Sequence, residues 1–136
     1  MNNRWGIYKA HLIEGLQELA DRQYQNDIWL NQNNPSHSVG SFIEAALAVF
    51  DDSLVMNALR AGAIIYDQKV TQALWELSIA LNAIDESRDE EAIISDPLMQ
   101  VVREKAARVL FLINVSIGEG NTVDLFELGM PAPPLP

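Results

Sequence analysis

Residues 67–84, DQKVTQALWELSIALNAI, carry the clearest structural signal in this chain of 136 residues. Apolar residues recur there at steps of four, three, four and three, namely Val70, Leu74, Leu77, Leu81 and Ile84. A helix turns by about 100° per residue, so this spacing places the five side chains on one stripe. Such a helix is too apolar to stand alone in water, and we therefore expect other segments to cover it.

The same spacing appears near both ends of the chain. Residues 4–20 carry Trp5, Tyr8, Leu12, Leu16 and Leu19 in helical register. Residues 97–115 do so with Leu98, Val102, Ala106, Val109 and Ile113. These two segments are predicted to be further amphipathic helices.

Capping residues mark where further helices begin. Asp21 precedes a short helix at 22–32, Ser41 with Glu44 forms a capping box before 42–50, and Asp67 precedes the segment at 67–84. Asp96 followed by Pro97 opens the last helix. A further short helix at 54–61 is expected to be capped by Asp51, Asp52 or Ser53 and to end at Gly62.

The predicted fold is all-α, a single small helical bundle or orthogonal helical domain of five to six helices. It covers residues 1–117, with a polar loop at 31–40 and an apolar connector at 63–66 that is either irregular or a short strand. Residues 118–136 form a C-terminal extension. Its apolar patch at 123–128 is expected to dock on the core, and its proline-rich end to be extended.

The charge is the outlying feature of the composition. The chain has 19 acidic and 9 basic residues, a net charge of −10, and no cysteine. An acidic surface repels phosphate backbones and anionic lipid, so we expect no nucleic-acid or membrane binding. The absence of cysteine excludes disulfides and thiolate metal sites. The N-terminal residues lack the apolar run of a signal peptide or anchor, which predicts a cytoplasmic protein. The charge itself either keeps the protein in solution or attracts a basic partner.

The densest acidic segment is DESRDEE, residues 85–91. It is either a solvated loop between helices or a docking surface that mimics phosphates in the basic cleft of a partner. In the second interpretation several carboxylates act together around a desolvated centre. The candidate partner-binding residues are Asp51, Asp52, Asp85, Glu86, Asp89, Glu90, Glu91 and Trp29.

The tryptophans differ in their expected positions. Trp5 and Trp75 lie on or beside the apolar stripes, and we expect them in the core. Trp29 lies next to the polar loop and is therefore the candidate interface anchor.

Residues suited to catalysis or metal binding do not form a recognisable motif. His11 has Glu14 one turn away, and His37 lies in the polar loop. Asp51 and Asp52 are adjacent, so on a helix they point about 100° apart and do not converge. We predict no catalytic residue, no metal site and no cofactor.

Residues 19–30, LADRQYQNDIWL, resemble a small bacterial family, as do Phe50–Asp52 and the Asp96-Pro97 helix start. Small acidic helical proteins of this kind are similar to immunity proteins encoded beside secreted toxins, including those of contact-dependent growth inhibition. The resemblance implies a protein that binds a toxin, and it assigns no catalytic residue to any position of this chain.

Three hypotheses follow. In the first, the protein is a cytoplasmic immunity protein that occludes the active site of a cognate toxin, a basic nuclease, and is a monomer or weak dimer alone. In the second, it is a non-enzymatic helical adaptor or a homo-oligomeric interaction protein. In the third, it is an enzyme that uses His11, Asp51 and Asp52 with a divalent metal.

Overall fold

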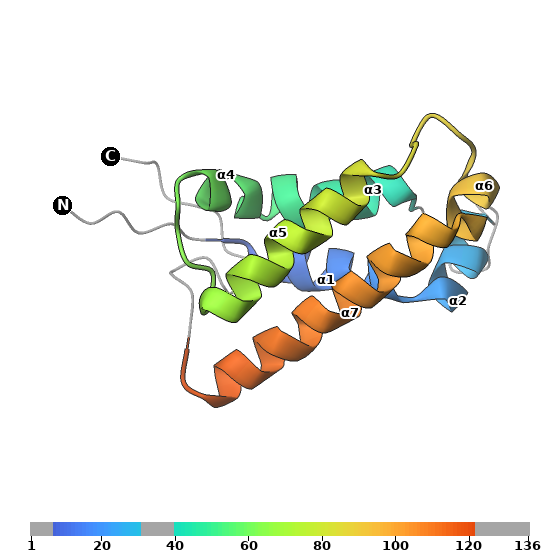
Figure 1. Cartoon of the computed structure of the whole chain (residues 1–136). Helices are drawn as coiled ribbons and strands as arrows, with labels where there is room; N and C mark the ends of the chain where they lie inside the picture. Colours follow the sequence, from blue (N-terminus) through green and yellow to red (C-terminus); the bar gives the residue numbers. More distant parts are fainter. Residues whose placement is uncertain (1–6, 31–39, 122–136) are drawn as a thin grey trace.

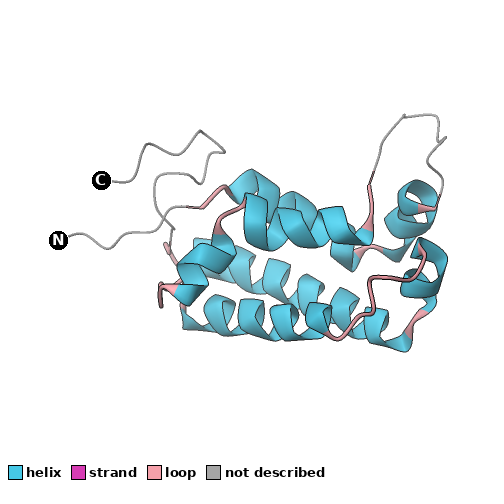
Figure 2. Ribbon diagram, turned by 90° about the horizontal axis from the view of Figure 1, so that it is seen from above, coloured by secondary structure: helices cyan, strands magenta, loops and turns pink. Residues whose placement is uncertain are grey.

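The computed structural model describes residues 7–30 and 40–121 (Figure 1). Within these ranges the chain forms helices joined by loops, with no strand (Figure 2). The all-α prediction is confirmed, with seven α-helices instead of five to six and with two π-helical segments, η1 and η2. The predictions for residues 1–6, including Trp5, for most of the loop at 31–40, including His37, and for residues 122–136 lie outside the described residues. The elements are α1 (Lys9–Ala20), α2 (Arg22–Tyr24), η1 (Gln25–Trp29), α3 (Phe42–Leu47), η2 (Ala48–Asp52), α4 (Val55–Arg60), α5 (Gln68–Asn82), α6 (Glu90–Ser95) and α7 (Pro97–Gly118).

Four of the predicted helix starts are confirmed by side-chain caps. The backbone N–H of Tyr24 donates to Asp21 at 3.1 Å, and that of Glu44 donates to Ser41 at 3.1 Å. Asp67 caps α5 by accepting from Val70 N–H at 2.8 Å. At the start of α7, the N–H of Leu98 donates to the Asp96 carboxylate at 2.8 Å, and Pro97 follows directly. Each cap satisfies a backbone donor that the first helical turn leaves unpaired.

The prediction that the helix is interrupted at Asp51 and Asp52 is wrong, whereas of the three residues expected to cap the next helix it is Ser53 that accepts a hydrogen bond from its first turn. The helix that begins at Phe42 widens into the π-helical turn η2 and runs through both aspartates. The chain turns at buried Ser53 instead, whose hydroxyl donates to the carbonyl of Val49. The same hydroxyl accepts from Val55 N–H at 3.2 Å, at the start of α4. Ser53 therefore both closes η2 and opens the next helix.

Gly62 ends α4 as predicted. It has φ +80°, and its N–H donates to the carbonyl of Leu59 while the N–H of Ala63 donates to that of Ala58. These two bonds form a Schellman motif, which needs a left-handed residue at this position. Residues 63–66 then form an irregular connector, tied to α5 because Ile65 N–H donates to the Thr71 hydroxyl at 2.8 Å.

The acidic segment 85–91 is only partly a loop. Asp89 accepts from Ala92 N–H at 2.9 Å and caps α6, so the last two acids of the segment begin a helix. Sequence reasoning missed α6 because its six residues carry too few apolar positions to show a helical period.

The core forms where α7 packs against α5 on one side and against α1 on the other (Figure 1). α1 in turn packs on α3 and η2, and this contact is very close at Gly15. A Cβ at Gly15 would lie 2.7 Å from Val49 Cγ2 and 2.9 Å from the carbonyl oxygen of Ala45. The glycine therefore allows the two helices to approach each other.

The predicted stripe at 67–84 faces the core. Its buried residues are Val70, Leu74, Leu77 and Ile84, whereas Leu81 is half-buried.

The buried face of α7 is rotated slightly from the predicted one. Four of the predicted residues are buried, namely Val102, Ala106, Val109 and Ile113. Leu98, however, is 44% exposed and Met99 takes its place in the core.

Arg103 of α7 is also buried, at 5% exposure. Its guanidinium donates to Gln25 Oε1 at 3.0 Å and to the carbonyl of Ile94 at 2.6 Å, which joins α7 to η1 and α6.

Candidate functional site

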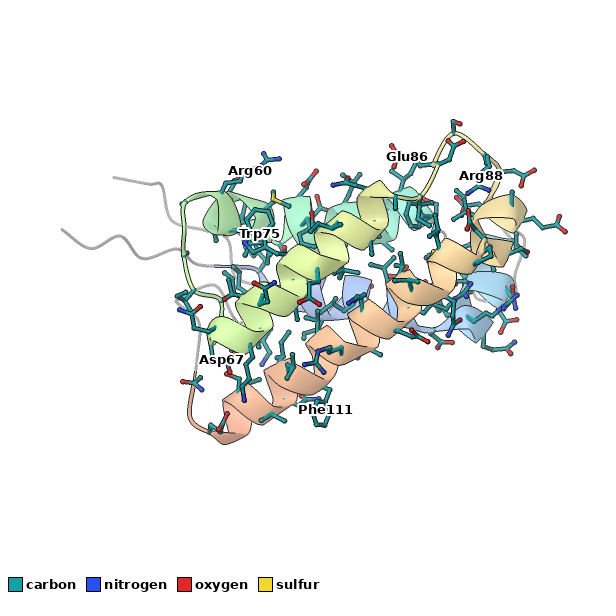
Figure 3. All side chains as sticks on the ribbon, viewed as in Figure 1. Arg60, Asp67, Trp75, Glu86, Arg88 and Phe111 are labelled. Carbon is teal, nitrogen blue, oxygen red and sulfur yellow. The ribbon has the colours of Figure 1, made fainter. Side chains whose placement is uncertain are left out.

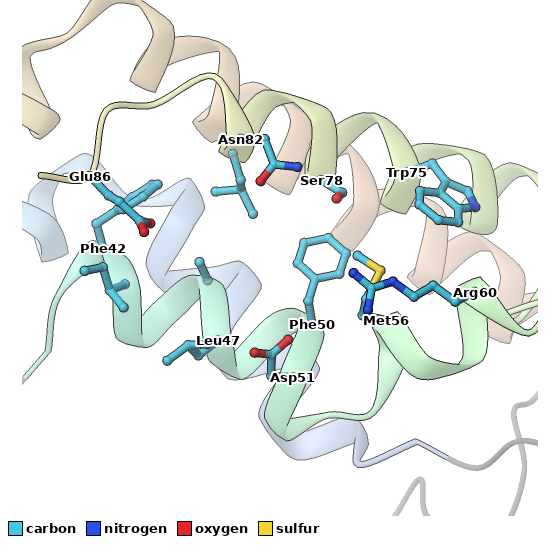
Figure 4. Close-up of a pocket in the computed structure, with 13 residues that line it drawn as sticks. Phe42, Leu47, Phe50, Asp51, Met56, Arg60, Trp75, Ser78, Asn82 and Glu86 are labelled. Atoms are coloured by element: carbon cyan, nitrogen blue, oxygen red, sulfur yellow. The ribbon is translucent and has the colours of Figure 1, made fainter.

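The helix formed by α3 and η2 is a surface ridge between two hollows. Ile43 and Leu47 of α3 are each 42% exposed. One hollow, here called the groove, lies between the ridge with α4 and the facing helix α5 (Figure 4). The other, here called the crevice, lies between the ridge and α1. Leu47 lines both hollows.

The groove exists because α5 packs along α7 and makes few close approaches to α3, η2 and α4. Its volume is about 400 Å³. Figure 4 shows Phe50 pointing from η2 across the groove toward Ser78 of α5. It is lined by Phe42, Ile43, Ala46, Leu47, Phe50, Asp51, Met56, Arg60, Trp75, Ser78, Leu81, Asn82 and Glu86.

The walls of the groove combine apolar side chains with the polar Ser78 and Asn82, and the groove is charged at three places. Met56 and Trp75 lie near Phe50 toward one end, where Arg60 of α4 also lies (Figure 4). Glu86 lies at the other end, and Asp51 projects from η2 between them. Such a surface offers apolar contact area together with a net negative charge, which suits a ligand that is apolar on one side and cationic beside it.

The crevice has a volume of about 360 Å³ and is dominated by acidic side chains. Its lining residues are His11, Glu14, Glu18, Gly40, Glu44, Leu47, Ala48 and Asp52. Burial raises the pKa of the Glu18 carboxyl, and the charges of Glu14 and Glu44 raise that pKa further. Hydrogen bonds from Trp29 and Tyr24 act in the opposite direction.

A second half-buried carboxylate extends this acidic region toward α6. Burial raises the pKa of the Glu90 carboxyl, which the nearby charges of Glu44 and Asp89 also raise. Glu90 accepts a hydrogen bond from the Phe42 N–H at 3.3 Å and so holds α6 against the start of α3. Among the described residues, no lysine or arginine forms an ion pair with Glu14, Glu18, Glu44 or Glu90.

The structure separates the predicted partner-binding acids into three positions. Asp51 and Glu86 line the groove. Asp52 lines the crevice, so the adjacent aspartates lie on opposite sides of the ridge, as their helical spacing predicts. The others lie around the loop and α6: Asp85 accepts from Ser87 N–H and hydroxyl, Asp89 caps α6, Glu90 binds the start of α3, and Glu91 is exposed.

The expected positions of two tryptophans are reversed. Trp29, the predicted interface anchor, is 2% exposed and packs edge-on against Phe42 with ring centroids 6.4 Å apart. Trp75, predicted to be in the core, is 37% exposed and lines the groove. The reason is that α5 is covered by α7 on one side only, so the residue beside its buried stripe faces the groove.

Sequence reasoning also missed Glu14, Glu18 and Glu44 as a group, together with Arg60. Glu14 and Glu18 are four residues apart on α1 and therefore share a face, which is a signal readable in the sequence. Their meeting with Glu44 depends on how α3 crosses α1, which no local pattern reveals.

The described residues contain no group of three His, Asp or Glu side chains placed to hold a metal ion. His11 lines the crevice with Asp52, but Asp51 lies in the groove, so the three residues of the enzyme hypothesis do not meet. His11 instead makes an edge contact with Tyr8, at 5.9 Å between ring centroids. The arrangement is suited to recognition by charge and apolar contact.

A second exposed surface lies between α5 and the first half of α7. It is nearly all apolar, and Ile79 is 69% exposed there. Leu98 and Val101 face it from α7, and the ion pair between Lys105 and Glu76, at 3.1 Å, borders it. Among the described residues, no helix has both the length and the apolar character needed to span a bilayer.

No family model, curated protein or solved structure matches this chain. The resemblance of residues 19–30 to toxin-associated immunity proteins therefore stays a prediction from the sequence.

Proposed function

We propose that this protein is a non-enzymatic, cytoplasmic immunity protein that binds a basic toxin, a nuclease, and occludes its active site. The observation that carries this proposal is the gathering of Glu14, Glu18, Glu44 and Asp52 in the crevice beside the apolar ridge. Net charge alone is also compatible with simple solubility, whereas repulsion among neighbouring carboxylates calls for a further reason.

Burial of the carboxylates, together with their mutual repulsion, lowers the stability of the free protein. A raised pKa means that the folded state disfavours the ionised form, so Glu18 and Glu90 each cost stability at neutral pH. Cationic side chains of a partner would remove that repulsion on binding. Such a trade of stability for recognition is common at functional surfaces.

The mechanism follows from the arrangement of charge and apolar area. The acidic face steers a basic partner toward the ridge and raises the association rate. Exposed Ile43 and Leu47, at the crest, then provide the desolvated contact that slows dissociation. A nuclease must attract phosphates with a basic cleft, so a ridge flanked by carboxylates is suited to fill it.

The test is growth rescue by co-expression with the toxin encoded beside this gene, together with association rates measured for the purified pair. Neutralising the exposed crevice acids with Glu14→Gln, Glu44→Gln and Asp52→Asn should lower the association rate roughly tenfold at low salt and flatten its salt dependence. The matched control, Asp27→Asn, Glu104→Gln and Glu119→Gln, makes the same change in net charge at exposed positions elsewhere. It should have a much smaller effect. Failure of the wild-type protein to rescue growth or to form a complex would refute the proposal.

The second candidate function is a homo-oligomeric interaction protein, favoured by the apolar surface between α5 and α7. Ile79, Leu98 and Val101 together expose apolar area that a second copy of the chain would cover. Sedimentation of the purified protein separates the two candidates. A stable dimer that Ile79→Glu converts to a monomer favours the oligomer, and a wild-type monomer excludes it.

A further inference from the structure

We infer that the groove binds an amphipathic, cationic helix of the partner protein, and that this helix lies with its C-terminus at Arg60 and its N-terminus at Glu86. The inference rests on the proposed function, because it names the part of the partner that the ridge and α5 hold. It concerns the groove only and does not involve the carboxylates of the crevice.

The length of the groove suits a helix of a few turns. Its lining extends along the ridge from Phe42 to Asp51, a rise on the order of 14 Å for a helical segment. That distance corresponds to about two and a half turns of a docked helix. Helices that bind in this way insert apolar side chains spaced three and four residues apart into a hydrophobic groove.

The walls provide the apolar contacts that such a helix needs. Met56 is half-buried and Trp75 is 37% exposed, and both lie beside Phe50 at the Arg60 end (Figure 4). Methionine adapts to the shape of a bound side chain, and tryptophan contributes strongly to binding when it becomes fully covered. This end of the groove is where the main apolar anchor of the helix would lie.

The charges select a cationic partner helix and set its direction. Asp51 comes from η2 and Glu86 from the loop that follows α5, and both attract lysine or arginine on the exposed sides of the helix. Arg60 and Glu86 lie toward opposite ends of the groove (Figures 3 and 4). A helix carries partial positive charge at its N-terminus and partial negative charge at its C-terminus, so it is stabilised with its N-terminus near Glu86 and its C-terminus near Arg60.

The test uses a 14-residue helical peptide of leucine and lysine as the probe, with an alanine/lysine peptide of equal charge as its control. Amide chemical shifts of the full-length protein should change along the groove with the leucine/lysine peptide only. A paramagnetic label at the peptide C-terminus should broaden signals around Arg60, and a label at the N-terminus should broaden those around Glu86.

Charge variants test whether the peptide contacts the carboxylates of the groove. Asp51→Asn with Glu86→Gln should weaken peptide binding by roughly tenfold. Asp27→Asn with Glu119→Gln makes the same charge change at exposed positions outside both the groove and the crevice and should have little effect. Asn82→Lys adds a repelling charge at an exposed position of the groove wall, whereas Gln72→Lys adds it elsewhere on α5. Only the first of these two should weaken binding.

Several outcomes would overturn the inference. These are equal binding of the alanine/lysine peptide, chemical-shift changes centred on the apolar surface of α5 and α7, identical broadening by both labels, or filling of the groove by a second copy of this chain.

Failure of this inference is distinguishable from failure of the proposed function. If the groove variants still rescue growth from the toxin while the crevice variants do not, the groove inference falls and the immunity function stands.

Discussion

Arg103 donates a hydrogen bond from Nε to Oε1 of Gln25 at 3.0 Å, across 78 positions of sequence. Gln25 is itself fully buried and donates to the carbonyls of Glu18 and Leu19 at the end of α1. Burial lowers the pKa of the Arg103 guanidinium, whose acceptors are the side-chain amide oxygens of Gln25 and Gln100 and the backbone carbonyl of Ile94. One buried cation thus connects α1, η1, α6 and α7 through neutral oxygen atoms.

Arg103→Ala should therefore destabilise the fold. The substitution leaves Gln25 Oε1 and the carbonyl of Ile94 without this donor, and each buried unsatisfied acceptor costs about 1–3 kcal/mol. We expect the free energy of unfolding in urea to fall by roughly 3 kcal/mol. Arg108→Ala, at an exposed position of the same helix, is the control and should change that energy by less than about 0.5 kcal/mol. Equal effects of the two substitutions would contradict this account.

Adding one methyl group at two glycines should have opposite effects. Gly15→Ala places a Cβ 2.7 Å from Val49 Cγ2 and 2.9 Å from the Ala45 carbonyl oxygen, so α1 and α3 must separate. We expect a loss of about 1–3 kcal/mol in the free energy of unfolding. Gly118→Ala meets no atom within 4 Å at the end of α7 and should be neutral or stabilising, by up to about 1 kcal/mol. Thermal denaturation of both variants would measure the difference, and a stable Gly15→Ala protein would show that the contact is loose.

Glu18 makes stability depend on pH in a direction that can be tested. Burial and the charge of Glu14 raise its pKa in the folded state above the unfolded value of 4.5. Between pH 4.5 and the raised pKa the native state binds more protons than the unfolded state, so the free energy of unfolding falls as pH rises through that window. Glu18→Gln should therefore be more stable than wild type at pH 7, and this advantage should shrink as the pH falls from the raised pKa to 4.5 and be lost below it.

The control for that experiment has the opposite sign. Hydrogen bonds from Lys105 and Gln72 lower the pKa of Glu76, so its ionised form stabilises the folded state above the unfolded pKa. Glu76→Gln should be less stable than wild type at pH 7 and should approach it as pH falls through the lowered pKa. Urea denaturation at several pH values measures both variants, and a parallel pH dependence for the two would rule out the assignment.

The cap of α5 provides a test of a feature predicted from sequence. Asp67→Ala removes the acceptor of the Val70 N–H and should lower the free energy of unfolding by about 1 kcal/mol. Asp67→Asn retains a capping oxygen and should lose less than half of that amount. Chemical denaturation distinguishes them, and equal losses would mean that the charge of Asp67 matters more than its hydrogen bond.

Local signals in the sequence were sufficient for most of the helix starts and for the core stripes. Caps such as Ser41 and Asp96 act within one helical turn, so the residues that form them are close in sequence. The buried stripe of α5 follows from spacing alone. These features do not depend on how the helices are packed.

Other features could not be predicted because they arise from packing. Arg103 looks like a surface residue of α7 until Gln25 and the carbonyl of Ile94 are placed around it. Trp75 faces solvent because α5 is covered on one side only. In the candidate site, the sequence identified Asp51, Asp52 and Glu86, but the division between groove and crevice required the path of η2.

The widened turn at η2 gives this surface one point at which the chain can lose a residue without changing the direction of its side chains. A π-helical turn accommodates one residue more than an α-helical turn. Deleting one residue among positions 48–52 would let ordinary helix re-form there. Because the π-helical turn already holds the additional residue, the side chains on either side of the shortened turn would keep their directions. A loss of one residue at this point would therefore leave the two hollows nearly intact, whereas the same deletion within α5 or α7 would turn one part of the helix relative to the other by about 100°.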